Sequence, residues 1–240
     1  MLTVYATEIS EIYGHGRRLV IWFSGCTLHC KGCMNQELWD RSSGKETAIE
    51  DLLNQIIDSK VDGVTYIGGE PLQQGEDLLI LSKRIRDIGL DVVLFTGYEL
   101  EELDSLQKSV ADLASVIIAG RYVESKRDTY LTHRGSSNQK VIIKDESLKP
   151  FYSEEVRQVE IIIDENSETY LGFPEDFIDD GQNPSNRGSD GNRSVFDTPV
   201  LVIWWIGIEL SHRTLYSTLA YSFLQPIAVN GKTDILGNNP

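Results

Sequence analysis

The sequence predicts an α/β fold with parallel strands, and three observations lead to this prediction. Short apolar runs alternate with stretches of helical periodicity through the first two thirds of the chain, and several of the runs end in glycine or a polar turn. Strands that are spaced by helices form right-handed βαβ units. In such folds, ligands bind at the carboxyl ends of the strands, so the residues that follow each strand are the first candidates for a site.

The first predicted strand is the apolar run at 18–24, which contains aromatic residues and suits a buried position. A helix is predicted at 47–59, because five apolar residues fall on one of its faces. Thr47 and Glu50 have the spacing of a capping box at its start.

The next strand, 63–69, ends in glycines, and a helix is predicted at 75–89 with Gly89 as its stop. Its buried face is expected to hold Leu78, Leu81, Ile85 and Ile88. A strand at 91–97 and a helix at 98–108 follow, and further strands are predicted at 115–120, 140–144 and 159–164.

The composition changes near residue 177, which divides the chain into a domain at 1–175 and an extension of unknown structure and function at 176–240. Residues 179–194 are rich in Asn, Ser, Gly and Asp and are predicted to form a linker or loop. The apolar run 199–208 is about half as long as a membrane span. Residues 214–229 are expected to form a helix that stops near Pro226.

The net charge of −15 argues against a nucleic-acid partner, because the phosphate backbone would be repelled. The N-terminus has no basic start followed by an apolar core, and no stretch approaches the roughly 18 apolar residues of a membrane span, so no membrane association is expected. Three clustered cysteines do not suit a disulfide framework, so a reducing cytoplasm is the expected location. Given this acidity, we expect a partner protein to present a basic surface, with Arg17, Arg18, Arg121 and Arg134 as local exceptions near the site.

All three cysteines of the chain, Cys26, Cys30 and Cys33, follow the first predicted strand within eight positions. A closed structural zinc site needs four ligands, so zinc would require a histidine. His29 lies inside the loop and is flanked by two candidate ligands, and His15, His133 and His212 lie elsewhere in the chain. A [4Fe–4S] cluster normally takes four cysteines, and three would leave one iron open for a substrate or cofactor. Both metals stay open on the spacing alone, with iron favoured.

The spacing C-x3-C-x2-C on a loop after the first strand resembles the signature of the radical S-adenosylmethionine family. A second motif, YIGGEPLQQ at 66–74, follows the second predicted strand. The resemblance implies a partial (β/α) barrel, a [4Fe–4S] cluster held by the three cysteines, and S-adenosylmethionine bound to the open iron. It also implies that Gly68, Gly69 and Glu70 bind the ammonium group of S-adenosylmethionine, and that Gly32, Cys33 and Met34 lie against its adenosyl group.

Shorter stretches resemble the activating enzymes of glycyl radical enzymes, among them YGHGRRLVIWFSGC at 13–26 and FTGY at 95–98. The segment RGSSNQ at 134–139 is similar to one in activases of anaerobic ribonucleotide reductase, while His15 and Ala119 depart from the family pattern. The residues of RGSSNQ alone suit a turn or an anion-binding nest.

This closer resemblance implies an oxidoreductase that cleaves S-adenosylmethionine reductively and leaves a glycyl radical on an anaerobic ribonucleotide reductase. A flavodoxin-like protein would supply the electron. Three alternatives stay open: an activase for a formate-lyase type enzyme, a small-molecule radical enzyme of the carboxy-deazaguanine synthase group, and a zinc-binding module without catalysis. Met34 and Asn35 stand where the small-molecule group tends to have Asp and Thr.

Overall fold

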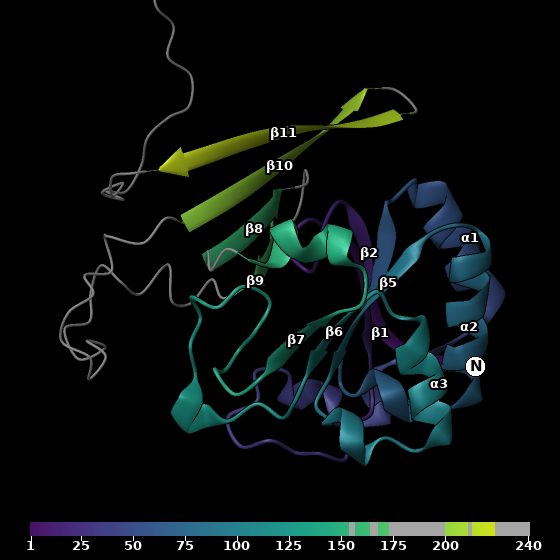
Figure 1. Ribbon diagram of the computed structural model, residues 1–240. Coiled ribbons are helices and arrows are strands. Elements are labelled where there is room, and N and C mark those ends of the chain that lie inside the picture. The colour runs from purple at the N-terminus through teal and green to yellow at the C-terminus, as the bar shows by residue number, and fades with distance from the viewer. Residues whose placement is uncertain (154–156, 164–167, 173–199, 211–212, 224–240) are drawn as a thin grey trace, which may run out of the picture.

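The computed structural model describes residues 1–153, 157–163, 168–172, 200–210 and 213–223. Its larger sheet has seven strands in the order β3-β1-β2-β4-β5-β6-β7 (Figure 1). Strands β2, β4, β5 and β6 run parallel, whereas β1, β3 and β7 pair antiparallel with their neighbours. The α/β class with parallel strands is therefore confirmed. The strands are β1 (Leu2–Ser10), β2 (Arg18–Phe23), β3 (Lys45–Thr47), β4 (Gly63–Gly68), β5 (Asp91–Thr96), β6 (Val116–Ala119) and β7 (Lys140–Ile143).

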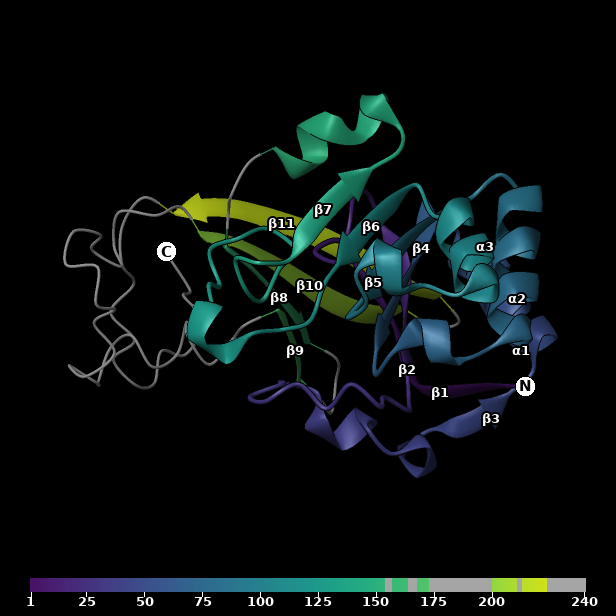
Figure 2. The same ribbon diagram turned by 60° about the horizontal axis from the view of Figure 1, so that its bottom comes forward.

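Three helices, α1 (Ile49–Ser59), α2 (Glu76–Asp87) and α3 (Ser105–Leu113), lie together on one side of this sheet (Figures 1 and 2). Most of the predicted apolar positions of α1 and α2 are buried, but Ile57 and Ile88 are about half exposed. Among the described residues, no helix is both long enough and apolar enough to span a bilayer.

Two predicted helix boundaries were wrong. Thr47 ends β3, and Ala48 caps α1 without a side-chain hydrogen bond, so the capping box of the sequence does not form. The helix predicted at 98–108 is divided into a short 3-10 turn, η4 (Leu100–Glu102), and α3. The division is caused by Asp104, which begins α3 in a reciprocal capping box with Gln107.

A second sheet of four strands has the order β11-β10-β8-β9 and lies away from the helices (Figure 2). The helix predicted at 214–229 was wrong over its described part, since β11 pairs antiparallel with β10 along its whole length. The stretch is rich in Thr, Tyr and Phe, residue types that favour strands, which suits its extended form. The strands are β8 (Arg157–Ile163), β9 (Glu168–Gly172), β10 (Val200–Leu210) and β11 (Arg213–Phe223).

The domain boundary at residue 175 stays a prediction. Strands from both sides of it, β8 and β9 before it and β10 and β11 after it, share the second sheet. The linker predicted at 179–194 lies outside the described residues. The two sheets meet where Ile12 packs against Ile162 and Leu171. Beside this contact, the Ser10 hydroxyl donates to the buried Glu160 carboxylate.

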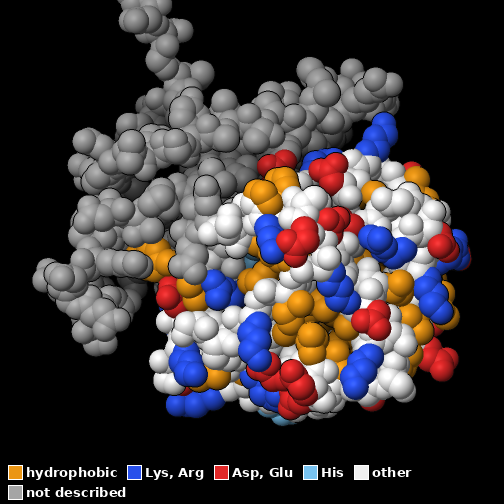
Figure 3. All heavy atoms as spheres, in the orientation of Figure 1, with side chains coloured by type: hydrophobic (Ala, Val, Ile, Leu, Met, Phe, Trp, Pro, Cys, Tyr) orange, Lys and Arg blue, Asp and Glu red, His pale blue; other side chains and the backbone are white. Residues whose placement is uncertain are grey.

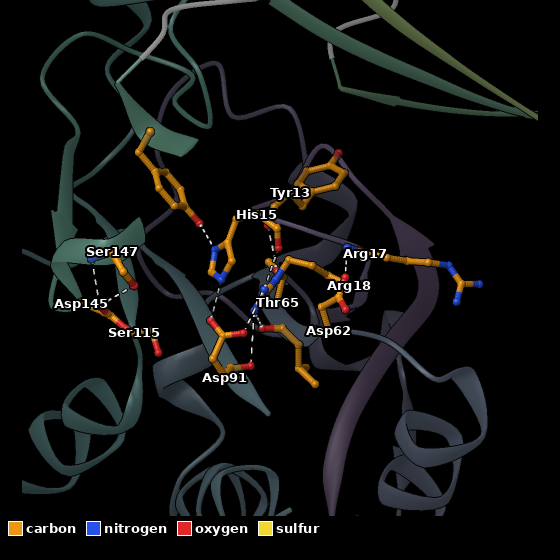
Figure 4. Close-up of polar contacts among 12 residues, drawn as sticks. Tyr13, His15, Arg17, Arg18, Asp62, Thr65, Asp91, Ser115, Asp145 and Ser147 are labelled. Carbon is orange, nitrogen blue, oxygen red and sulfur yellow. Dashed lines mark hydrogen bonds and ion pairs between the residues drawn. The ribbon is translucent and has the colours of Figure 1, made fainter. Parts of the chain in front are cut away.

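The amino ends of the parallel strands are tied together by Arg18, whose side chain is completely buried (Figure 4). Its Nε donates to Thr65 Oγ1 at 2.8 Å, and its Nη1 donates to Asp91 Oδ1 at 3.1 Å. His15 continues the network, with Nε2 3.2 Å from Asp91 Oδ2 and Nδ1 2.9 Å from the Tyr152 hydroxyl. Burial by itself would raise the pKa of Asp91, but the contacts with His15 and Arg18 outweigh it and hold that pKa below its usual value.

This network corrects two expectations. Arg18 is not near the carboxyl ends of the strands, so it is unavailable to a partner there. His15, which departs from the family pattern, has a structural role in this chain, because its ring links Asp91 of β5 to Tyr152 of η6 (Glu146–Tyr152).

Replacing Arg18 by Met should lower the free energy of unfolding by about 3–5 kcal/mol, because Asp91 would keep a largely buried charge without its main partner. Urea denaturation followed by circular dichroism measures the loss. The control is R84M, which breaks the exposed Arg84–Glu50 pair and should change stability little. Equal effects of the two substitutions would contradict this account of Arg18.

Candidate functional site

The three cysteines lie on a loop that leaves the carboxyl end of β2 and folds back beside it. Cys26 N donates to Trp39 O at 3.0 Å, which closes the loop. Within it, Cys33 N donates to Cys30 O at 3.1 Å, and the positive φ of 73° at Gly32 permits this tight turn. The backbone thus brings the three thiols to one end of the sheet, and all three are partly buried.

The glycine turn after β4 lies directly against this loop. Gly69 N donates to Phe23 O at 2.7 Å, and Glu70 N donates to Gly25 O at 2.9 Å. A Cβ at Gly69 would lie 2.6 Å from Gly25 O, and Gly68 has a φ of 110°. Only glycine fits this close approach of two backbones, which is the physical reason for both glycines of the motif.

Glu70 joins this turn to the end of β5. Its Oε1 accepts from Leu72 N at 3.0 Å and from the Thr96 hydroxyl at 2.9 Å, and its Oε2 accepts from Gly97 N at 2.8 Å. The residue is only 1% exposed, and burial raises its pKa to about 7 although the three hydrogen bonds favour the ionised form. Since a carboxylate has about four acceptor positions, Oε2 retains capacity for a cationic ligand.

The cysteine loop, the glycine turn with Glu70 and the FTGY stretch meet around one cavity of about 250 Å³, as the parallel topology predicts. Thr96 and Gly97, from the FTGY stretch, line it together with most of the predicted site residues. The predicted residues on its wall are Cys26, Cys30, Cys33, Met34, Gly68, Gly69 and Glu70. Gly32 is the exception among them: it lies under the Glu124 side chain, whose Oε1 would be 2.9 Å from a Cβ at this position.

The structure gives little support to a zinc ion completed by His29. The His29 ring packs against Trp39 with the ring centroids 4.7 Å apart, and His29 does not line the cavity. Within the described part of the chain, no three His, Cys, Asp or Glu side chains are grouped as ligands of a metal ion. A four-iron cluster is wider than a single ion, so cysteines that bind different irons need not converge on one point. Three cysteines of one loop facing one cavity therefore fit such a cluster, with one iron left for another ligand.

Sequence reasoning named His133 only as one of several histidines that could complete a zinc site, and did not predict that it lines the cavity. Its backbone has a φ of 61°, and its Nδ1 lies 3.1 Å from Ile12 O. Burial lowers the pKa of His133 to about 4, so the ring is neutral at physiological pH. A carbonyl only accepts, so the proton is assigned to Nδ1 and Nε2 is an acceptor. No local sequence signal could place His133 at the cavity, because the residue that positions its ring, Ile12, is distant in sequence.

The RGSSNQ segment forms another part of the wall, but it is not an open anion nest. Gln139 Oε1 accepts from Gly135 N at 2.8 Å and from Ser136 N at 3.2 Å, while Gln139 Nε2 donates to Gly120 O at 3.0 Å. The nest is thus filled by the chain's own amide. Arg134 and Gly135 still line the cavity.

Comparisons with known proteins agree with this chemistry. The family model "4Fe-4S single cluster domain" matches residues 12–142. The anaerobic ribonucleoside-triphosphate reductase-activating protein of Escherichia coli K12 is 39% identical over 142 residues, which are 55% of this chain and 92% of that protein. The protein of the same name from Haemophilus influenzae is 35% identical over 147 residues, or 58% of this chain and 94% of its own length.

The crystal structure of QueE from Escherichia coli superposes on 49% of this chain and 70% of its own, with a TM-score of only 0.37 and 16% identity. The family match at 12–142 includes all three cysteines and the glycine turn. The chain therefore belongs to the 4Fe-4S single cluster domain family and is a relative of the anaerobic ribonucleoside-triphosphate reductase-activating proteins.

Proposed function

We propose that this chain is an iron–sulfur activase that uses S-adenosylmethionine to place a glycyl radical on an anaerobic ribonucleoside-triphosphate reductase. The observation that carries the proposal is the single cavity that three cysteines share with the glycine turn and Glu70. The names of the relatives support the reductase as the target in preference to a formate-lyase type enzyme.

Cys26, Cys30 and Cys33 would hold the cluster. Bound there with S-adenosylmethionine, it would supply one-electron chemistry that removes a hydrogen atom from a glycine of the partner. Burial raises the pKa of the Cys26 and Cys30 thiols, so in the absence of metal these ligands are held as neutral thiols. Metal binding must therefore release protons from the loop.

Glu70 and the two glycines would bind the ammonium group of S-adenosylmethionine. The three hydrogen bonds on Glu70 fix its carboxylate before any ligand arrives, so little reorganisation is needed on binding. Gly68 and Gly69 let the ligand approach the backbone, and Met34 on the cysteine loop lines the adjoining wall. The position of Gly32 beneath Glu124 makes its predicted contact with the adenosyl group depend on movement of that side chain.

Apolar side chains form much of the remaining cavity wall, among them Ile67, Phe95 and Ile118. The Tyr13 and Phe95 rings both belong to this wall and pack edge to face against each other, with centroids 6.4 Å apart. Such a wall limits water near a reactive species and gives hydrogen abstraction few competing partners. We further propose that the parallel strands form the partial barrel of the radical S-adenosylmethionine family, that a flavodoxin-like protein donates the electron, and that the protein acts in the cytoplasm.

The decisive experiment mixes the anaerobically reconstituted protein with S-adenosylmethionine, a reductant and the cognate reductase. Electron paramagnetic resonance should then show a glycyl radical signal on the reductase, and chromatography should show 5′-deoxyadenosine. A reductase variant with Ala in place of the target glycine is the control and should give no such signal. An intact cluster with a silent spectrum would contradict the proposed partner.

Replacing any one of the cysteines, as in C26A, C30A or C33A, should abolish the bound cluster, because two remaining thiolates are too few to hold it. Iron and sulfide content and the broad visible absorption of the reconstituted protein measure the loss. The matched control is T27A on the same loop, which should keep the wild-type iron content. Full iron content and nucleotide cleavage in any cysteine variant would exclude these ligands.

Relative to E70Q, the cluster-free wild type should lose stability as the pH rises from about 4.5 to about 7. The folded pKa of Glu70 is raised to about 7 from 4.5, so the folded state holds its proton more tightly and the stabilisation is complete only below about pH 4.5. The expected loss is about 3 kcal/mol in the free energy of unfolding. Urea denaturation across this range should show the stability of the wild type falling relative to that of E70Q, whereas E76Q, an exposed control, should stay parallel to the wild type. The comparison with E70Q removes the opposite contribution of His133, whose pKa is lowered to about 4 and which is present in all three proteins. Parallel curves for wild type and E70Q would contradict the assigned pKa.

A further inference from the structure

Positive charge is concentrated in one segment of this acidic chain. Residues 121–140 contain five Lys or Arg and two Asp or Glu, a net charge of +3, whereas the whole chain carries −15. Lys and Arg side chains gather at the lower left of Figure 3, where the ribbon of Figure 1 carries this segment. The segment therefore differs in sign from the protein as a whole.

This cationic segment borders the cavity. Tyr122 and Thr129 line the cavity on either side of the exposed turn η5 (Glu124–Lys126), and Arg134 lines it further along. Lys31, next to Cys30 on the cysteine loop, reaches the same turn through an ion pair with Glu124 at 3.0 Å. These charged side chains therefore lie beside the cavity wall.

The structure fixes the positions of several cations in this segment. Arg121 and Lys140 are engaged by the neighbouring acidic turn, through Glu102 at 2.6 Å and Glu99 at 2.8 Å. Lys126 and Arg127 are exposed on the chain reversal at η5. That reversal is fixed by the backbone, because Ser137 N donates to Lys126 O at 2.9 Å. The two cations thus have a defined place beside the cavity, on the turn between the lining residues Tyr122 and Thr129.

We propose that this turn is a docking surface for an acidic segment of the activated protein, with Lys126 and Arg127 as its main contacts. The inference rests on the proposed function, which requires a protein glycine to enter this cavity. An acidic partner would be repelled by most of this chain and attracted by the turn beside the cavity, so the charge pattern would steer it toward the cavity. This reverses the expectation, based on net charge, that the partner presents a basic surface.

The test compares two charge reversals of equal size in the full chain, K126E/R127E and K83E/K108E. Lys83 and Lys108 are exposed on α2 and α3, away from the cavity, so the second variant controls for net charge. Association with the cognate anaerobic ribonucleoside-triphosphate reductase is measured anaerobically at several salt concentrations. The rate constant at low salt should fall about tenfold in K126E/R127E and less than about twofold in K83E/K108E, and the salt dependence should weaken only in the former.

Both variants should cleave S-adenosylmethionine to 5′-deoxyadenosine at the wild-type rate when the reductase is absent, which shows that fold and cluster are intact. Equal slowing in both variants, no slowing, or faster association of K126E/R127E would each overturn the docking surface. Loss of RNA binding with unchanged reductase association would assign the surface to nucleic acid instead. If the wild type itself forms no 5′-deoxyadenosine, the proposed function fails, whatever the association rates show.

Discussion

The site depends on one backbone contact, the close approach of Gly69 to Gly25. A Cβ at Gly69 would lie 2.6 Å from Gly25 O, and the hydrogen bond from Glu70 N to the same oxygen holds the two chains together. This contact fixes the glycine turn of β4 against the start of the cysteine loop. Every later feature of the site follows from it, because the thiols and the Glu70 carboxylate then face the same cavity.

Burying Glu70 costs free energy, and the fold offsets that cost with hydrogen bonds instead of a paired cation. Leu72 N, Thr96 Oγ1 and Gly97 N all donate to its carboxylate, yet burial still leaves its pKa near 7. The pKa of Asp91, at the other end of the sheet, is shifted in the opposite direction. There the contacts with Arg18 and His15 outweigh burial and lower the pKa. The structural carboxylate is neutralised within the protein, whereas the one in the cavity is left to meet a cation from outside.

The rest of the cavity wall is built from distant parts of the chain. The segment from Gly120 to Gln139 closes one side, with its own amide group filling the RGSSNQ turn. Gln158 and Gly172, from the second sheet, reach the same cavity. The family match ends at residue 142, so these two residues extend the site beyond the region shared with the family. The cavity is thus a property of both sheets and of the cationic segment that forms part of its wall.

The sequence alone determined the local parts of this protein. The alternation of apolar runs and helical faces gave the parallel α/β class, and the spacing of the cysteines and glycines placed the ligand-binding loops, because these signals act over a few residues. Tertiary structure decided what no local signal encodes. Thr47 ended in a strand, residues 213–223 paired as a strand with β10, and Arg18 was buried at the far end of the sheet. His133 joined the cavity through Ile12, and the cations at 126–127 came to lie on a turn between two residues of its wall. Such outcomes depend on contacts between residues far apart in the chain, whose energies the intervening sequence does not display.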